Sequence, residues 1–192
     1  MPALPLPIPE TKPATEFIDG RMVQKMSPYG LHGRVQLKIG AALQQWAEAR
    51  GRGRVGTEWD FDLTPYGEQT NRLVPDVAFL SYERVSYDDE PSAQVPRIAP
   101  DVAVDILSEG QTLENSRRRL KILFATGAQL AILIDPRKER AWLIDPQSTR
   151  MLGPDDYIEH AALPEFRMPL RACFQRTPPS TALRSAQDDK LG

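Results

Sequence analysis

The stretch from Asp101 to Ile134 constrains the fold more than any other part of the sequence. Residues 101–107 are apolar and β-prone, residues 112–126 repeat apolar side chains at helical spacing, and residues 130–134 are continuously apolar. A strand, a helix and a second strand in this order favour a crossover that leaves the two strands parallel. A continuously apolar strand is typical of the centre of a sheet covered on both faces. The stretch therefore predicts a sheet with helices packed against it.

The other periodic segments add strands and one long helix. Residues 16–24 predict a β-hairpin, because Asp19-Gly20 is a two-residue turn whose central positions both need positive φ. Apolar spacing predicts a helix at 31–49, strands at 55–63, 73–80 and 140–144, and a loop or short helix at 81–97. On this pattern Asp76 and Asp105 each lie in the middle of a strand. Val102, Val104 and Ile106 share one face of their strand.

Bulk composition bounds the class of protein. The 192 residues, 41% of them hydrophobic, suffice for one domain with a core, which we place at 15–174. A proline-rich arm precedes it at 1–14, and a flexible tail follows at 175–192. The formal net charge of −2 does not support nucleic-acid binding, although it leaves room for a local basic patch. The single cysteine, Cys173, excludes an intrachain disulfide and suits a cytoplasmic setting, and no apolar run is long enough to span a membrane.

Two carboxylates, Asp76 and Asp105, are embedded in apolar, β-prone segments, and a basic run follows at 117–121. A carboxylate on a buried strand is costly unless a cation or hydrogen-bond donors compensate its charge. If the two strands are neighbours, both carboxylates can point to one side, and Mg²⁺ or Mn²⁺ between them would relieve their repulsion. A metal-bound water beside a Lys or Arg is suited to attack a phosphodiester.

The ordered motifs resemble the PD-(D/E)xK nuclease superfamily and, more narrowly, its Uma2 family, also catalogued as a domain of unknown function. The matching pieces are Glu16-Phe-Ile-Asp-Gly-Arg21, Met26-Ser-Pro28, His32, Val74-Pro-Asp-Val-Ala-Phe79, Pro100-Asp-Val-Ala-Val-Asp-Ile-Leu-Ser108, Phe124-Ala-Thr-Gly127 and Leu133-Ile-Asp-Pro136. The resemblance implies a single α/β (α+β) domain, with a restriction-endonuclease-like mixed β-sheet flanked by helices. It also implies an Mg²⁺-dependent endonuclease that hydrolyses DNA phosphodiester bonds. Whether the protein is a homodimer stays open.

Carried onto this chain, the resemblance makes Asp76 and Asp105 metal ligands, with Glu16 as a further candidate and the carbonyl of Ile106 as another. The motif's lysine position two residues after Asp105 is Leu107. Counting back from Gly127, the position that matches the family's lysine on the following helix is Arg119, and Lys121 is the nearest lysine. Arg119 and Lys121 are therefore both candidates for the catalytic cation. An arginine can hold a phosphate oxygen but cannot act as a general base.

Each candidate also has a structural interpretation. The aspartates could face water at a sheet edge, the basic run could be a solvated helix face, and Glu16 could be an ordinary hairpin carboxylate. Other polar residues favour structural roles: Glu58 in an exposed acidic stripe, Asp101 as a cap or turn, and His32 as a helix-start hydrogen-bonding residue. Ser108 lacks a His-Asp partnership, and Arg50, Arg52 and Arg54 suit a DNA backbone or solvent equally.

Two other functions therefore stand beside the endonuclease. The first is a catalytically weak or inactive member of the fold that acts as a nucleic-acid or protein-interaction domain, which Leu107, Arg119 and the net charge favour. The second is a metal-dependent hydrolase of another phosphoester.

Overall fold

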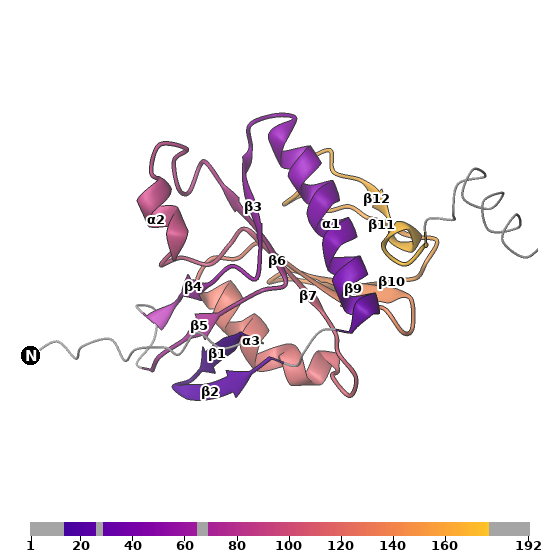
Figure 1. Cartoon of the computed structure of the whole chain (residues 1–192), viewed down its shortest axis with the longest axis horizontal. Helices are drawn as coiled ribbons and strands as arrows, with labels where there is room; N and C mark the ends of the chain where they lie inside the picture. Colours follow the sequence, from indigo (N-terminus) through magenta and orange to yellow (C-terminus); the bar gives the residue numbers. More distant parts are fainter. Residues whose placement is uncertain (1–13, 26–28, 65–68, 177–192) are drawn as a thin grey trace, which may run out of the picture.

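The computed structural model describes residues 14–25, 29–64 and 69–176. They form a mixed α/β domain in which a central sheet is covered by a helix on each face (Figure 1), as the sequence predicts. The predicted arm at 1–14 and tail at 175–192 lie almost wholly outside the described residues. Within the described part of the chain, no helix has the length and hydropathy to cross a membrane.

The larger sheet is mixed and has six strands. In spatial order they are β10 (Thr149–Leu152), β9 (Arg140–Ile144), β8 (Leu130–Asp135), β7 (Val102–Ile106), β6 (Val77–Ser81) and β3 (Gly53–Thr57). β7 and β8 run parallel, and the other neighbouring pairs of this sheet are antiparallel. Helix α3 (Leu113–Ala125) joins β7 to β8, which confirms the predicted crossover. A capping box begins α3, because Thr112 and Asn115 each accept a hydrogen bond from the other's backbone N–H.

A smaller antiparallel sheet lies beside α3 (Figure 1). In spatial order it contains β2 (Arg21–Gln24), β1 (Thr15–Ile18), β5 (Arg72–Leu73) and β4 (Phe61–Asp62). β1 and β2 are the predicted hairpin, and its turn has φ of 52° at Asp19 and 72° at Gly20. Near the C-terminal end of the described chain, β11 (Tyr157–Ile158) pairs with β12 (Met168–Pro169), which leads into the 3-10 helix η2 (Leu170–Cys173).

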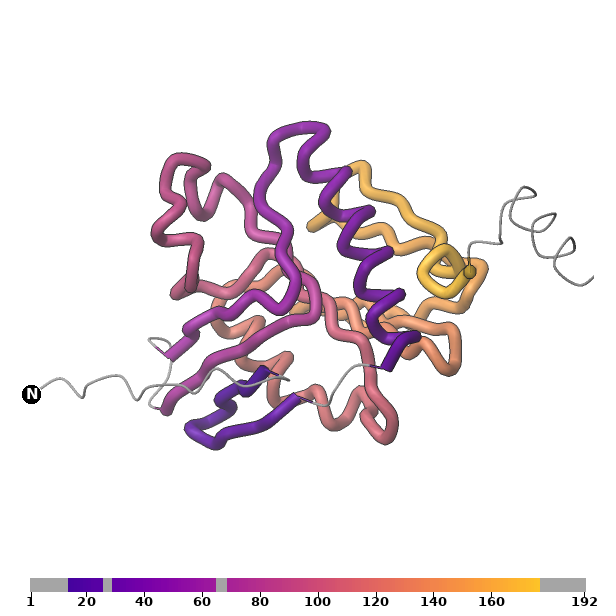
Figure 2. The backbone as a smooth tube through the Cα atoms, viewed as in Figure 1, coloured from indigo at the N-terminus to yellow at the C-terminus, as the bar shows by residue number. Residues whose placement is uncertain are grey.

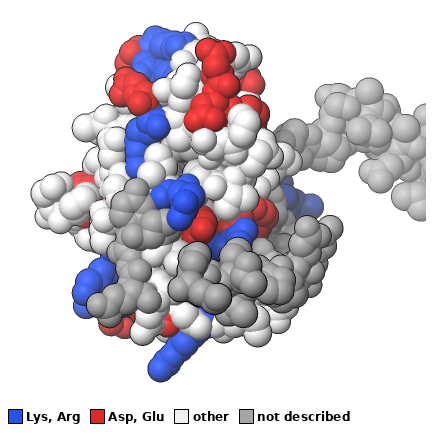
Figure 3. Space-filling model, turned by 90° about the vertical axis from the view of Figure 1, so that its left-hand side faces the viewer, with Lys and Arg blue, Asp and Glu red and all other residues white. Residues whose placement is uncertain are grey.

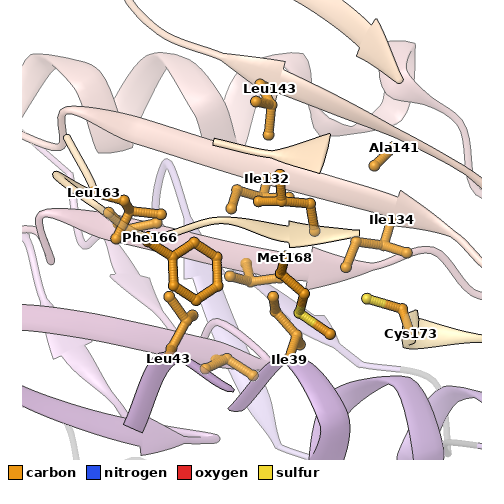
Figure 4. Packing of buried hydrophobic residues seen from close by; sticks show 14 of the residues in the cluster. Ile39, Leu43, Ile132, Ile134, Ala141, Leu143, Leu163, Phe166, Met168 and Cys173 are labelled. Atoms are coloured by element: carbon orange, nitrogen blue, oxygen red, sulfur yellow. The ribbon is translucent and has the colours of Figure 1, made fainter. Parts of the chain in front are cut away.

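The core fills both sides of the larger sheet. Helix α1 (Gly30–Glu48) packs its buried residues, among them Ile39 and Leu43, against one face (Figure 4), while α3 and the short helix α2 (Glu90–Gln94) lie over the other. Val102 and Val104 point toward α1, whereas Ala103 points toward α3. The alternation predicted for this strand is therefore confirmed, and it places Asp105 on the α3 side of the sheet.

One predicted strand, at 55–63, is wrong. β3 ends at Thr57, Glu58 takes a left-handed backbone conformation with φ of 50°, and β4 begins at Phe61 in the other sheet. A non-glycine residue in this conformation ends the regular ladder. The apolar alternation continues across the break because each sheet buries apolar residues of its own. Since residues 55–63 do not form one strand, the predicted acidic stripe on one strand face does not form.

A second prediction, that Asp76 lies within a strand at 73–80, is also wrong. β5 ends at Leu73 in the smaller sheet and β6 begins at Val77 in the larger one, so Asp76 lies in the bend between them. Pro75 has no backbone N–H to donate to a ladder, which suits a segment that leaves one sheet and enters another. This bend carries the chain past the end of β7, where the candidate site lies.

Candidate active site

Five charged side chains from separate segments meet where the inner strands β6 and β7 of the larger sheet begin and end, respectively. Glu16 comes from β1, Lys25 follows β2, Asp76 lies in the bend before β6, Asp105 is the penultimate residue of β7, and Arg119 lies on α3. The hairpin, the bend and α3 are distant in sequence, yet Figure 2 shows them side by side. Three of these side chains are at most 10% exposed, so their charges must be compensated inside the protein.

Asp76 is the most buried of the acids, with 3% of its side chain exposed. Its Oδ1 accepts a hydrogen bond from Lys25 Nζ at 2.5 Å, and its Oδ2 accepts one from the backbone N–H of Ile106 at 2.6 Å. His32, in the first turn of α1, places Nε2 3.4 Å from Oδ2. Burial by itself raises the pKa of Asp76, but the contacts with His32 and Lys25 outweigh it and lower the pKa to about 2. Asp76 is therefore held as a carboxylate.

Lys25 connects this acid to the backbone and to the rim of the site. Its Nζ donates to the carbonyl of Val74 at 2.9 Å and to Glu58 Oε2 at 3.3 Å, besides its bond to Asp76. Burial lowers the pKa of Lys25, but the negative charges of Asp76 and Asp105 raise it above its usual value. Glu58 is 45% exposed and thus marks where this part of the cluster meets solvent.

Arg119 holds the other two acids. Its Nε and Nη2 donate to the two carboxylate oxygens of Asp105 at 2.8 and 3.1 Å, and its Nη1 donates to Glu16 Oε1. The same Glu16 oxygen accepts the backbone N–H of Val74 at 2.7 Å. Burial lowers the pKa of Arg119, but Asp105 and Glu16 raise it well above its usual range. The guanidinium is therefore a permanent cation fixed between two carboxylates.

The two halves of the cluster act on each other electrostatically. Burial raises the pKa of Asp105, Arg119 opposes that rise, and the charge of Asp76 adds to it. Three carboxylates face two cationic side chains, Lys25 and Arg119, which leaves an excess of one negative charge before His32 is counted. A buried region with excess negative charge attracts a cation.

The structure separates the remaining sequence candidates from this cluster. Lys121 is exposed on α3, and two positions along a helix place it on a different side from Arg119, so its catalytic role stays a prediction. Asp101 is buried and accepts bonds from Ser81 N and Gln129 Nε2, which ties the end of β6 to the start of β8. Ser108 lies in a turn. The arginines at 50, 52 and 54 pair with Glu165 and Glu90 near the C-terminal end of α1, whereas His32 lies at its N-terminal end.

Three residues at the site were missed or expected in other roles from the sequence. Lys25 carried no signal, because a lysine at the end of an exposed hairpin strand resembles ordinary surface charge. His32 was expected to form hydrogen bonds at the helix start. It is buried and its Nε2 faces Asp76, while its Nδ1 has no hydrogen-bond partner within the described residues. Glu58 was expected in an acidic stripe, but it instead contacts Lys25 and Gln36.

The donor set fits Mg²⁺ better than a metal that needs a closed protein cage. In the described part of the chain, no three His, Cys, Asp or Glu side chains are grouped closely enough to hold a metal ion. Glu16 lies across Arg119 from Asp105, so the predicted set of three acid ligands does not converge. Mg²⁺ is commonly held by one or two carboxylates together with waters and substrate phosphates. Asp76 and Asp105 are the two carboxylates of the cluster that could serve in this way, and each also accepts hydrogen bonds from the protein.

Comparisons with known proteins agree with this architecture. A family model named Uma2 and described as "Putative restriction endonuclease" matches residues 3–171, which is most of the chain. Among solved structures, the chain is similar to "a putative nuclease belonging to DUF820" from Anabaena variabilis ATCC 29413. The TM-score is 0.74, with 24% identity, over 86% of this chain and 92% of that chain; likeness at this level shows the fold. A comparison with curated proteins gives no significant match.

Proposed function

The chain belongs to the Uma2 family, and we propose that it is a divalent-metal-dependent endonuclease that hydrolyses DNA phosphodiester bonds. The observation that carries the proposal is the buried cluster at the end of β7. There Asp76, in the bend just before β6, interacts electrostatically with Asp105, on the neighbouring strand β7, and the acids of the cluster outnumber its cations by one. Burying several charged groups together costs free energy of folding, because each group loses its hydration. Such clusters are common at active sites.

In the proposed site, Asp76 and Asp105 hold Mg²⁺ or Mn²⁺. When bound, the metal supplies Lewis-acid polarisation of the phosphodiester and activation of water. Hydrolysis adds that water across the bond: its oxygen joins phosphorus, one P–O ester bond breaks, and the leaving oxygen takes up a proton. A metal held by only two side chains keeps positions open for water and for phosphate oxygens.

The surrounding residues fix the two acids in place. The backbone N–H of Ile106 and the amine of Lys25 orient the carboxylate of Asp76. Arg119 donates hydrogen bonds to both carboxylate oxygens of Asp105, and its third nitrogen donates to Glu16. Catalytic groups need to be held in position before substrate arrives, and these contacts provide that support.

Substitution of the acids tests the proposal. Asp76→Asn and Asp105→Asn preserve side-chain size, so we expect folded proteins whose Mg²⁺-dependent cleavage of plasmid DNA is reduced by at least about 10²–10³-fold. Asp88→Asn changes an exposed aspartate before α2 and serves as the matched control, with cleavage at the wild-type rate. Circular dichroism establishes that each variant is folded. Wild-type cleavage by Asp76→Asn would rule the proposal out.

One observation favours a second candidate, a nuclease fold without efficient chemistry that binds nucleic acid or protein. Every acid in the cluster already contacts a cation within the chain: Asp76 contacts Lys25, and Glu16 and Asp105 share Arg119. Titration calorimetry separates the candidates, since the endonuclease must bind Mg²⁺ or Mn²⁺ with Asp76 present. No heat of binding, together with intact DNA in the cleavage assay, would favour the second candidate.

A further inference from the structure

The two cations of the cluster, Lys25 and Arg119, differ in how readily they can contact a ligand. All three nitrogens of the Arg119 guanidinium already donate to carboxylates, and only 10% of its side chain is exposed. Moving it toward a phosphate would leave Glu16 and Asp105 as uncompensated buried charges, which is strongly unfavourable. Arg119 is therefore held by Glu16 and Asp105 and is not available to bind a phosphate.

Lys25 lies in a different position. Its side chain is 18% exposed, and one of its three partners, Glu58, is 45% exposed. A lysine amine is a compact charge on a flexible four-carbon chain, so it can exchange an exposed carboxylate partner for a phosphate oxygen while it keeps its bond to Asp76. The contact with Glu58, at 3.3 Å, is also the longest of the three.

The overall charge of the protein makes a single cation at the site important for contact with a nucleic-acid backbone. On the face shown in Figure 3, positive and negative side chains are interspersed among the described residues, without a broad basic surface. The whole chain carries a formal net charge of −2. A protein of this kind depends on individual, well-placed cations for contact with a nucleic-acid backbone, because it lacks a general positive field.

We propose that Lys25 is the residue that contacts a DNA phosphate at this site, and that Arg119 is a positioning residue that holds Glu16 and Asp105. The proposal rests on the proposed function insofar as the ligand is DNA. Lys25 then contributes in two ways: it anchors the phosphate next to Asp76, and it stabilises negative charge that develops on the phosphate during hydrolysis. Its displacement from Glu58 on binding leaves that carboxylate to solvent.

The salt dependence of DNA binding tests the contact without any catalysis. Binding of a short fluorescein-labelled duplex in EDTA is measured by anisotropy from about 50 to 200 mM salt. The association constant K falls as salt rises, so log K plotted against log[salt] has a negative slope. Lys25→Met loses one phosphate contact and should make this slope less negative by about 0.9, whereas Lys25→Arg should keep the wild-type slope. Lys38→Met is the matched control, because Lys38 is also half-buried but donates to backbone carbonyls at the C-terminal end of η2. A wild-type slope for folded Lys25→Met would overturn the assignment.

A double variant covers the case in which Lys25→Met does not fold. Asp76→Asn with Lys25→Met removes both charges of the buried pair, and its slope is compared with that of Asp76→Asn alone. The expected difference is again about 0.9, and no difference would overturn the assignment. Because this comparison needs neither metal nor cleavage, it stands apart from the proposed function. Binding with the expected slope change but no cleavage by the wild type would defeat the endonuclease alone. No DNA binding by the wild type in EDTA would overturn the assignment of Lys25, whereas the endonuclease is tested separately by cleavage in Mg²⁺.

Kinetics and metal binding distinguish a catalytic contact from a merely structural one. If the wild type cleaves, Lys25→Met should lower kcat by about 10²-fold, with a much smaller change in KM, and Lys25→Arg should recover most of the loss. Mn²⁺ affinity, measured by calorimetry, should be kept or increased in Lys25→Met because a positive charge next to Asp76 is removed. Loss of Mn²⁺ binding would indicate that Lys25 only shapes the site and would refute the assignment.

Discussion

Replacing Arg119 with methionine removes the cation that compensates two carboxylates and keeps most of the buried volume. Glu16 is 6% exposed and Asp105 is 17% exposed, and Arg119 donates to both. Breaking a buried ion pair on one side typically costs about 3–5 kcal/mol, because the remaining charge is left uncompensated. For a chain of this length each kcal/mol shifts Tm by about 2–4 °C, so the expected fall in Tm is on the order of 10 °C.

The pH dependence of this loss has a definite sign. Burial already raises the pKa of Asp105 in the native protein and Arg119 opposes that rise, so the substitution moves the folded-state pKa of Asp105 further above its unfolded value. A raised folded-state pKa means that the folded form binds the proton more tightly. The destabilisation is therefore largest at high pH and is relieved as pH falls toward the unfolded value of about 4.

Urea denaturation at pH 8 and pH 5 measures both effects through the midpoint, provided that the m-value is unchanged. Arg118→Met is the matched control: this neighbouring arginine is 52% exposed and pairs with Asp19 at the surface, where ion pairs contribute little. Adding Asp105→Asn to Arg119→Met should restore part of the lost stability. A free energy of unfolding within about 1 kcal/mol of the wild type for Arg119→Met at pH 8 would refute the reasoning.

Four further predictions concern the rest of the fold. Burial raises the pKa of Cys173 to about 12, so the native protein should resist thiol alkylation at pH 8 and react once unfolded, as mass spectrometry would show. Gly53→Ala would place Cβ 2.4 Å from a carbonyl oxygen of the adjacent strand and should cost about 1–3 kcal/mol in urea denaturation. Gly33→Ala, in open space on α1, should stabilise by about 0.5–1 kcal/mol. Leu43→Ala should cost about 2–5 kcal/mol, whereas exposed Leu37→Ala should cost little by the same measurement.

Local signals in the sequence were sufficient for the framework of the fold. The Asp19-Gly20 turn specified its hairpin because few residue pairs accept positive φ at both positions. The crossover from β7 to β8 was predictable because helical and strand periodicities alternate there at short range, and the capping residue Thr112 marks the helix start. Each of these elements is decided by residues close to one another in the chain.

The site itself depends on long-range contacts that periodicity does not report. Lys25 meets Asp76 across 51 positions, and Arg119 meets Glu16 across 103. The position of Asp76 also escaped prediction, because apolar residues on both sides of Pro75 and Asp76 conceal the point where the chain leaves one sheet and enters another. The ordered motifs indicate Asp76, Asp105, Glu16 and Arg119 as candidates. They do not reveal that Arg119 is held between two of the acids.

The acids of the cluster also accept hydrogen bonds from the backbone. Glu16 accepts the N–H of Val74 and Asp76 accepts the N–H of Ile106, at points where the strands leave their regular ladders. These carboxylates would therefore be retained by selection for folding even in a lineage that no longer cuts DNA. A relative that has kept both acids has preserved these two hydrogen bonds to the backbone. Only a measurement of turnover would reveal whether it has also kept enzymatic activity.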